Sequence, residues 1–199
     1  MIKVAQFMKA HGMDAERVDL NAYTKAIVES MKAGLGGDES SLPMIPTYLT
    51  TGRRLARNEK AVVIDAGGTN FRTAVISFNA KGAVVESQST QPMPGSSEPV
   101  SWGDFIENVA DAVQPLMGEA KNIGFCFSYP VEITPERDGK VLGLTKQVDI
   151  RGACGSYLGS SLRAELERRG VQVGRIVVLN DTPATLLAAK ALSKGAYSG

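Results

Sequence analysis

Hydrophobic and polar positions divide the chain into a helical N-terminal part and a longer part that begins with strands. In the N-terminal part, apolar residues recur every three or four positions, as on one face of a helix: Leu20, Tyr23, Ile27 and Met31. The glycines at positions 34, 36 and 37 are typical of a helix end. We therefore predict helical structure from residue 1 to about residue 35, then a linker rich in Gly, Pro and Arg up to residue 60.

From residue 61 the pattern predicts strands first and then an alternation of strands and helices. Apolar runs separated by glycine-containing turns predict an antiparallel meander: residues 61–64, 71–78 and 83–85. A loop of Pro, Gly and Ser is expected at 90–100. The elements predicted after it are a helix from Ser101 to about Met117, strands at 122–127 and 175–179, a helix at 160–169, and a last helix that Thr182 caps and Pro183 opens. This succession predicts an α/β fold with a mixed sheet.

Composition narrows the class of protein. The chain has 199 residues, of which 43% are hydrophobic and 22% charged, which is typical of a globular domain that needs no disulfide or metal for stability. Its 22 Lys and Arg residues balance 21 Asp and Glu residues, and a net charge of +1 argues against a nucleic-acid binder. The arginine-rich end of the linker is most simply a solvated loop.

Rare residues and missing patterns exclude further classes. The single histidine, His11, argues against a Ser–His–Asp triad and against a histidine-rich zinc site. Without a run of 18 apolar residues or a secretory signal, we expect an unprocessed cytoplasmic protein with no membrane partner. Cys126 and Cys154 form no CxxC pair, and we predict both to be buried free thiols.

The segment at 65–70 is the first candidate for chemistry. Its strand ends in Asp65, and two glycines, Thr69 and Asn70 follow, with Arg72 shortly beyond. Glycines let the backbone approach an anion closely, and Asp65 is placed to hold magnesium through water. An ordinary hairpin turn is the structural alternative, because neither a Walker A pattern nor GxGxxG occurs in the chain.

Three further polar segments follow apolar runs. Asn180-Asp181 comes at the end of a predicted strand, where a carboxylate is a candidate base for a substrate hydroxyl, although a helix cap is the alternative. Two weaker candidates are Ser128-Tyr129-Pro130 and Thr145-Lys146, whose alternatives are a strand-to-loop turn and a surface lysine. Taken together, these hydroxyl, amide, ammonium and carboxylate groups suit a sugar.

The order of the motifs resembles that of the hexokinase family, which includes the glucokinases. Residues 64–72 are similar to the family's phosphate-1 motif, and residues 40–48 are similar to the segment that leads into its small domain. Residues 124–130 resemble the sugar-binding signature, with Tyr129 where Phe is usual. Thr145-Lys146 and residues 180–182 follow in the family's order. The resemblance spans roughly residues 20–199, and because five segments in register are far more specific than any one, it favours the functional interpretation of each segment.

The resemblance implies an actin-like, ribonuclease H-like ATPase domain: a mixed five-stranded sheet with an antiparallel three-strand meander, flanking helices and an N-terminal helical arm. The implied divisions are an arm and linker at 1–60, the small domain at 61–181, and at 182–199 the start of a helix leading into a large domain. The implied reaction is phosphorylation of a hexose at its 6-hydroxyl by ATP and Mg²⁺, the first step of glycolysis. Glucose is the first candidate, with fructose and mannose next.

Two qualifications accompany that implication. Family members are longer, and their second phosphate motif, adenosine site and sugar-contacting glutamates would lie beyond Gly199, so we expect this chain to be inactive alone. The alternatives are a non-catalytic sugar sensor or regulator of the same fold, another actin-like ATPase, or a free-standing binding module. Retention of Asp181 and Lys146 argues against the sensor.

The resemblance also implies a role for each candidate residue. Asp181 and Lys146 would be catalytic, with Asp181 as the base. The residues implied at the sugar are Ser128, Tyr129, Pro130, Thr145, Lys146, Asn180 and Asp181. Those implied at the ATP phosphates are Asp65, Gly67, Gly68, Thr69, Asn70 and Arg72, with Asp65 also facing Mg²⁺ through water.

Overall fold

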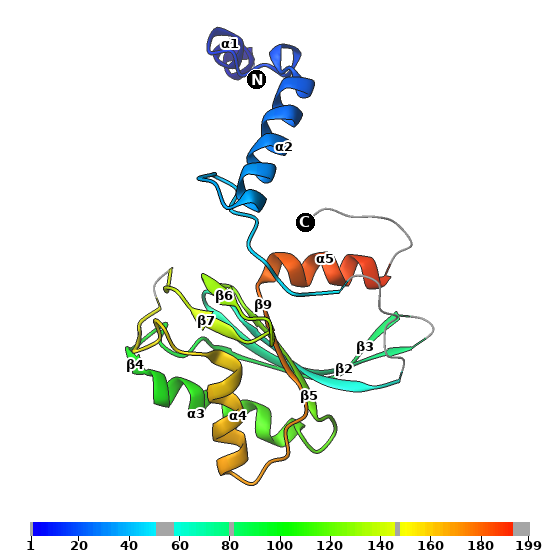
Figure 1. Ribbon diagram of the computed structural model, residues 1–199, viewed down its shortest axis with the longest axis vertical. Coiled ribbons are helices and arrows are strands. Elements are labelled where there is room, and N and C mark those ends of the chain that lie inside the picture. Colours follow the sequence, from blue (N-terminus) through cyan, green and yellow to red (C-terminus); the bar gives the residue numbers. More distant parts are fainter. Residues whose placement is uncertain (1, 51–57, 80–81, 146–147, 193–199) are drawn as a thin grey trace. The chain divides into compact units, whose positions relative to one another are not determined.

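The computed structural model describes residues 2–50, 58–79, 82–145 and 148–192 (Figure 1). Lys146, one of the two predicted catalytic residues, lies outside them. The chain divides into two compact units, Met1–Pro46 and Thr47–Gly199. None of the helices within the described ranges combines the length and the hydrophobicity that are needed to cross a bilayer.

The first unit is helical, as predicted. Its elements are α1 (Ile2–Ala10), the short 3-10 helix η1 (Ala15–Arg17) and α2 (Leu20–Gly36). Asp19 begins α2, because its carboxylate accepts hydrogen bonds at 3.0 Å from the N–H groups of Asn21 and Ala22. Gly37 ends the helix with a left-handed φ of 83°, so the predicted helix end is confirmed closely.

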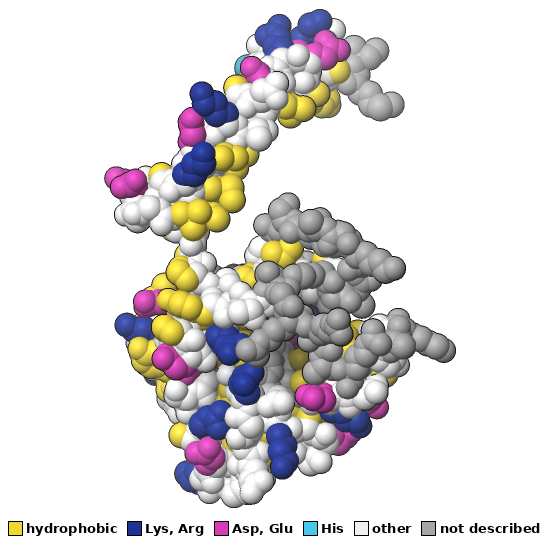
Figure 2. Space-filling model, turned by 45° about the vertical axis from the view of Figure 1, so that its right-hand side comes forward, with side chains coloured by type: hydrophobic (Ala, Val, Ile, Leu, Met, Phe, Trp, Pro, Cys, Tyr) yellow, Lys and Arg dark blue, Asp and Glu magenta, His cyan; other side chains and the backbone are white. Residues whose placement is uncertain are grey.

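The apolar stripe of α2 is exposed, and Figure 2 shows hydrophobic side chains gathered along this helix. The structure describes every residue of α2, and none of them is buried. The large exposed apolar side chains of the helix are Leu20, Tyr23, Ile27, Val28 and Leu35. A continuous apolar face of this kind marks a contact surface.

A mixed five-stranded sheet forms the centre of the second unit, as the sequence predicts. Its strands are β1 (Lys60–Ala66), β2 (Asn70–Asn79), β3 (Gly82–Pro92), β5 (Asn122–Phe127) and β9 (Ile176–Leu179). They lie in the order β3-β2-β1-β5-β9. The first three form the antiparallel meander, whereas β1, β5 and β9 run parallel. The prediction of a loop at 90–100 is wrong at its start, because the edge strand β3 continues to Pro92.

Helices cover both faces of this sheet in Figure 1, with α3 and α4 on one face and α5 on the other. Their bounds are α3 (Trp102–Val113), α4 (Leu158–Arg168) and α5 (Asp181–Leu192). Ser101 caps α3 as predicted, through a capping box with Asp104. The helix ends at Val113 and continues as the 3-10 helix η2 (Gln114–Leu116), because Pro115 lacks the N–H that would bond back into α3.

The predicted starts of the last two helices are wrong. Helix α4 begins at Leu158 because the carboxylate of Asp138, far back in the chain, accepts the N–H groups of Gly159 and Ser160 at 2.6 and 2.9 Å. Helix α5 begins at Asp181, so Thr182 is not its cap. The Asn180 carbonyl accepts the N–H of Ala184 at 3.1 Å and already belongs to the helical pattern.

Two small sheets and one exposed thiol were not predicted. The first sheet pairs β4 (Val100–Ser101) with β8 (Ile150–Arg151), and the second pairs β6 (Val131–Ile133) with β7 (Gly139–Val141). Both cysteines are free, but only Cys126 is partly buried. The prediction that Cys154 is buried is wrong, because the loop that carries it is open to solvent.

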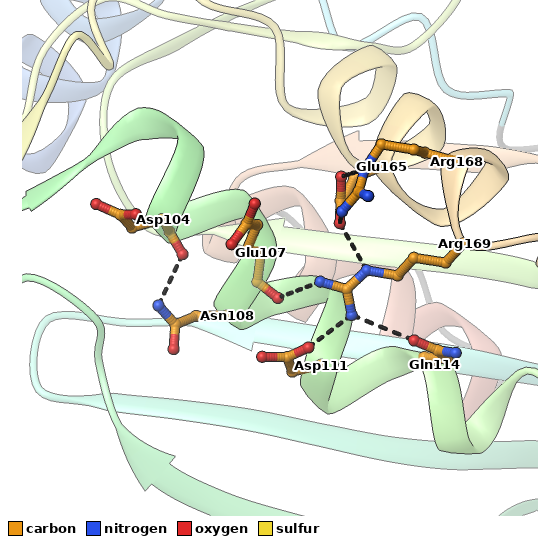
Figure 3. Close-up of polar contacts among 8 residues, drawn as sticks. All are labelled: Asp104, Glu107, Asn108, Asp111, Gln114, Glu165, Arg168 and Arg169. Atoms are coloured by element: carbon orange, nitrogen blue, oxygen red, sulfur yellow. Dashed lines mark hydrogen bonds and ion pairs between the residues drawn. The ribbon is translucent and has the colours of Figure 1, made fainter.

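Arg169 joins the two helices on one face of the sheet (Figure 3). Its guanidinium donates to Asp111 of α3 at 2.6 Å and to Glu165 of α4 at 2.6 Å. It also donates to the side-chain oxygen of Gln114 at 3.2 Å and to the carbonyl of Glu107 at 3.4 Å. Because its side chain is only 16% exposed, these contacts hold α3 and α4 together where water screens them less.

Candidate functional site

Three of the predicted polar segments meet at one edge of the sheet. In the register of the parallel strands, Asp65 of β1 pairs with Cys126 of β5, and Cys126 pairs with Leu179 of β9. The segments that follow these strands therefore leave the sheet side by side, at the carboxyl ends where open α/β sheets bind ligands. The prediction that strands of one sheet precede these segments is confirmed, and the structure adds that the three strands are neighbours.

Hydrogen bonds link the three segments in a row. The Ser128 N–H donates to the Ala66 carbonyl at 3.1 Å, which continues the pairing of β1 and β5. On the other side, the Asn180 side-chain amide donates to the Phe127 carbonyl at 3.1 Å and lies 3.5 Å from the Tyr129 carbonyl. The backbone of the middle segment, residues 127–129, is thus hydrogen-bonded to the segments on both sides of it.

The glycine turn between β1 and β2 is tight. The Gly67 N–H donates to the Asn70 carbonyl at 3.0 Å, and the Thr69 carbonyl accepts the N–H of Met93 at 3.0 Å. A Cβ at Gly67 would lie 3.4 Å from the Asn70 carbonyl oxygen, which is an ordinary van der Waals contact. Its Thr69 hydroxyl is exposed and accepts a hydrogen bond from the Asn70 amide at 3.3 Å.

Asp65 and Arg72 form an ion pair beside this turn. They face each other across β1 and β2, with Nη1 of the arginine 3.0 Å from Oδ2 of the aspartate. The side chains are 43% and 45% exposed, so this pair contributes no more than about 1 kcal/mol to stability. Its effect is to hold a carboxylate and a guanidinium at the edge where the strands end.

Asp181 presents an exposed carboxylate at the first turn of α5. Its Oδ1 accepts the N–H of Thr182 at 2.8 Å. This hydrogen bond orients the carboxylate at the N-terminus of α5. The carboxylate therefore lies where the sheet edge and the helix begin.

Cys126 lies between the two carboxylates. Burial raises the pKa of its thiol to about 11, and the negative charges of Asp65 and Asp181 add to that shift. The thiol therefore stays protonated at neutral pH. Sequence reasoning did not assign Cys126 to the site, although its place in the segment 124–130 was a signal. Because Asp65 and Cys126 are paired in the parallel register, their side chains lie on the same face of the sheet.

The remaining residues predicted to contact the sugar differ in how exposed they are. Ser128 is half-buried, while Pro130 and Thr145 are exposed. The Leu142 N–H donates to the Pro130 carbonyl at 2.9 Å, so the strand pair β6–β7 brings the segment leading to Thr145 back beside the middle segment. Tyr129 differs, because its side chain is only 1% exposed and packs in the core. In this structure its ring faces away from any open surface.

Comparison with known proteins decides the family. The family model described as Hexokinase matches residues 3–191. The chain belongs to the hexokinase family. The family predicted from the order of the motifs is thereby confirmed.

Curated hexokinases match most of the chain but are much longer. Hexokinase-1 of Schizosaccharomyces pombe is 29% identical over 188 residues, which cover 90% of this chain and 39% of that protein. Hexokinase-3 of Rattus norvegicus is 29% identical over 175 residues, covering 84% of this chain and 19% of that protein. The chain thus spans well under half the length of the relatives it matches.

Solved structures confirm the predicted fold class. A hexokinase from Schistosoma mansoni, complexed with glucose, superimposes with a TM-score of 0.68 at 24% identity, covering 83% of this chain and 39% of that one. A second crystal structure of a hexokinase gives a TM-score of 0.62 at 20% identity, covering 93% of this chain and 46% of that one. At these identities the likeness shows the fold, which is the actin-like fold of sugar kinases.

Proposed function

We propose that the protein containing this chain phosphorylates a hexose, glucose first, at its 6-hydroxyl with ATP and Mg²⁺. The observation that carries the proposal is the row of hydrogen bonds that places the glycine turn, the Ser-Tyr-Pro segment and Asp181 together at the carboxyl ends of β1, β5 and β9. The glucose in the Schistosoma mansoni structure supports the choice of sugar.

On the sugar side, Asp181 accepts the proton of the 6-hydroxyl. It requires position more than a raised pKa, because the proton leaves late in phosphoryl transfer. The other residues that we assign to contacts with the sugar are Asn180, Ser128, Pro130, Thr145 and Lys146. In this proposal Lys146 also acts on the transferred phosphoryl group.

On the nucleotide side, the residues present fit a magnesium-bound triphosphate. The turn at 67–70 brings two glycines to the ends of the strands, and Asp65 and Arg72 offer opposite charges beside it. In this proposal Asp65 binds Mg²⁺ through water, and phosphate oxygens complete the shell. Bound ATP supplies the phosphoryl group, and the ion neutralises its charge.

We also propose the organisation of the longer protein. Residues 1–60 form an arm and linker, 61–181 the small domain, and 182–199 the start of a helix into a large domain. The exposed apolar stripe of α2 supports this, because it needs a covering surface and the large domain is a partner of the same polypeptide. The chain alone then lacks part of both ligand sites, and we expect it to phosphorylate no sugar.

A coupled ADP-release assay on the longer protein, with glucose, fructose and mannose, tests the function. Asp181→Asn keeps an oxygen for the Thr182 N–H but removes the base, so we expect at least a hundredfold loss of kcat with glucose binding retained. Glu167→Gln, the same loss of charge on an exposed carboxylate of α4, is the matched control. Glucose binding without turnover in the wild type would favour the non-catalytic sensor. A near-normal rate of Asp181→Asn would refute the assignment of the base.

A further inference from the structure

Tyr129 reaches from the core to the turn of the candidate nucleotide site. Its ring packs against Phe127, with the ring centroids 4.8 Å apart. Its hydroxyl donates a hydrogen bond to the carbonyl of Gly67 at 2.8 Å. Burial raises the pKa of the phenol above its ordinary value, so the hydroxyl remains a donor throughout the neutral range. A residue of the sugar signature is therefore bonded to the glycine turn.

This hydrogen bond controls the direction of a neighbouring amide. The Gly67 carbonyl and the Gly68 N–H belong to one peptide group, and the described parts of the chain contain no cis peptide bond. In a trans peptide the C=O and N–H bonds point in opposite directions. Because the Tyr129 hydroxyl holds the carbonyl toward the core, the Gly68 N–H points away from the core.

A peptide between two glycines needs such an anchor. Without Cβ atoms on either side, the peptide plane rotates at little steric cost, and the N–H has no fixed direction. The Gly67 N–H donates to the Asn70 carbonyl inside the turn. Because this N–H belongs to the peptide between Ala66 and Gly67, that hydrogen bond does not fix the peptide between Gly67 and Gly68. The Tyr129 hydroxyl is thus the contact that fixes the plane between the two glycines.

We propose that Tyr129 is a positioning residue, whose hydroxyl fixes the Gly67–Gly68 peptide so that the Gly68 N–H is presented to the nucleotide phosphates. The proposal rests on the proposed function, and it assigns the side chain of Tyr129 to the nucleotide side of the reaction. This differs from the sugar contact implied by the resemblance, and it agrees with a ring that is 1% exposed.

The test is Tyr129→Phe in the longer protein. Phe is usual at this position in the family, so the variant is expected to fold. Loss of one neutral hydrogen bond predicts a KM for ATP that rises about two- to tenfold, with the KM for glucose unchanged. Tyr157→Phe is the matched control, because it removes the same group from a side chain that is 41% exposed and lies elsewhere. An unchanged KM for ATP, or an equal rise for glucose, would overturn the proposal.

A second readout needs no turnover. In the ¹⁵N-labelled 199-residue chain without nucleotide, Tyr129→Phe should shift or broaden the Gly68 amide resonance, whereas Tyr157→Phe should leave it in place. A Gly68 resonance that is the same in all three proteins would refute the anchoring. If the wild type phosphorylates no hexose, the proposed function fails, but the role of Tyr129 can still be tested. The Gly68 resonance and the affinity for MgADP, measured by calorimetry, then decide that role.

Discussion

Gly139 of β7 lies so close to Val178 of β9 that we expect a single methyl group to destabilise the second unit. A Cβ at Gly139 would lie 2.6 Å from Cγ1 and 3.3 Å from Cβ of Val178, and 3.5 Å from Cδ1 of Leu158. The first distance is roughly 1 Å shorter than the optimum for two carbon atoms. Val178 is only 1% exposed and β-branched, so neither a rotamer change nor a shift of its side chain relieves the contact easily.

The expected cost of Gly139→Ala is about 1–3 kcal/mol in the free energy of unfolding, as for other overpacked cores. Urea denaturation followed by the fluorescence of Trp102, the single tryptophan, measures it. Gly118→Ala is the control, because a Cβ there meets no described atom within 4 Å. The double variant with Val178→Ala removes the clashing methyl groups, so its loss should be smaller than the sum of the two single losses. A Gly139→Ala protein within about 0.5 kcal/mol of the wild type, or strictly additive losses, would refute the reasoning.

Two further predictions concern titration and thiol reactivity. Hydrogen bonds from Arg168, and to a smaller extent from Arg169, lower the pKa of Glu165 from 4.5 to about 2. The ionised Glu165 therefore stabilises the fold fully above pH 4.5, and this stabilisation is lost as the pH falls toward 2. In urea denaturation the wild type should therefore lose more stability than Glu165→Gln between pH 5 and pH 2.5, and equal losses would contradict the ion-pair assignment. Cys154 is exposed while the Cys126 thiol is partly buried with a pKa of about 11, so a disulfide reagent at pH 8 should modify one thiol fast and one slowly. Cys154→Ser should remove the fast phase, and a fast phase that survives would show that Cys126 is accessible.

The main sheet could be predicted because its strands are apolar and buried. Residues 61–64 and 122–127 are short apolar runs, and the structure places both in the middle of the sheet. Strand β3 was predicted too short because it lies at the edge, where side chains such as Glu86 and Gln88 face solvent and leave no hydrophobic pattern. Strands β4 and β8 have two residues each, and such short elements follow from tertiary contacts rather than from local pattern.

Helix starts show the same limit. Ser101 caps α3 through a residue three positions away, and this local signal was read correctly. Helix α4 is capped by Asp138, which lies 21 positions before Gly159, and no local pattern reports such a contact. A helix start can therefore be predicted from sequence when the capping residue is close to the helix along the chain, and not when it is far away.

The polar segments of the candidate site could be found in the sequence, but the pairing of their strands and the direction of their side chains could not. The structure alone shows that β1, β5 and β9 are parallel neighbours, so that these segments leave the sheet side by side. The resemblance assigned Tyr129 to the sugar. Strand alternation gives the observed answer, since Phe125, Phe127 and Tyr129 are buried on one face while Cys126 and Ser128 lie on the other. The alternation of side chains along this segment could therefore have predicted both that Tyr129 is buried and that the Cys126 thiol faces the site.

The long separations within the site have a consequence for how the chain folds. The hydrogen bond from Tyr129 to Gly67 spans 62 positions, and the one from Asn180 to Phe127 spans 53, whereas Asp65 and Arg72 are seven positions apart in a local hairpin. Local hairpins close early, and parallel pairings that close long loops form late. We therefore expect the glycine turn and its ion pair to form before the hydrogen bond that anchors the turn and before Asp181 comes to lie beside it.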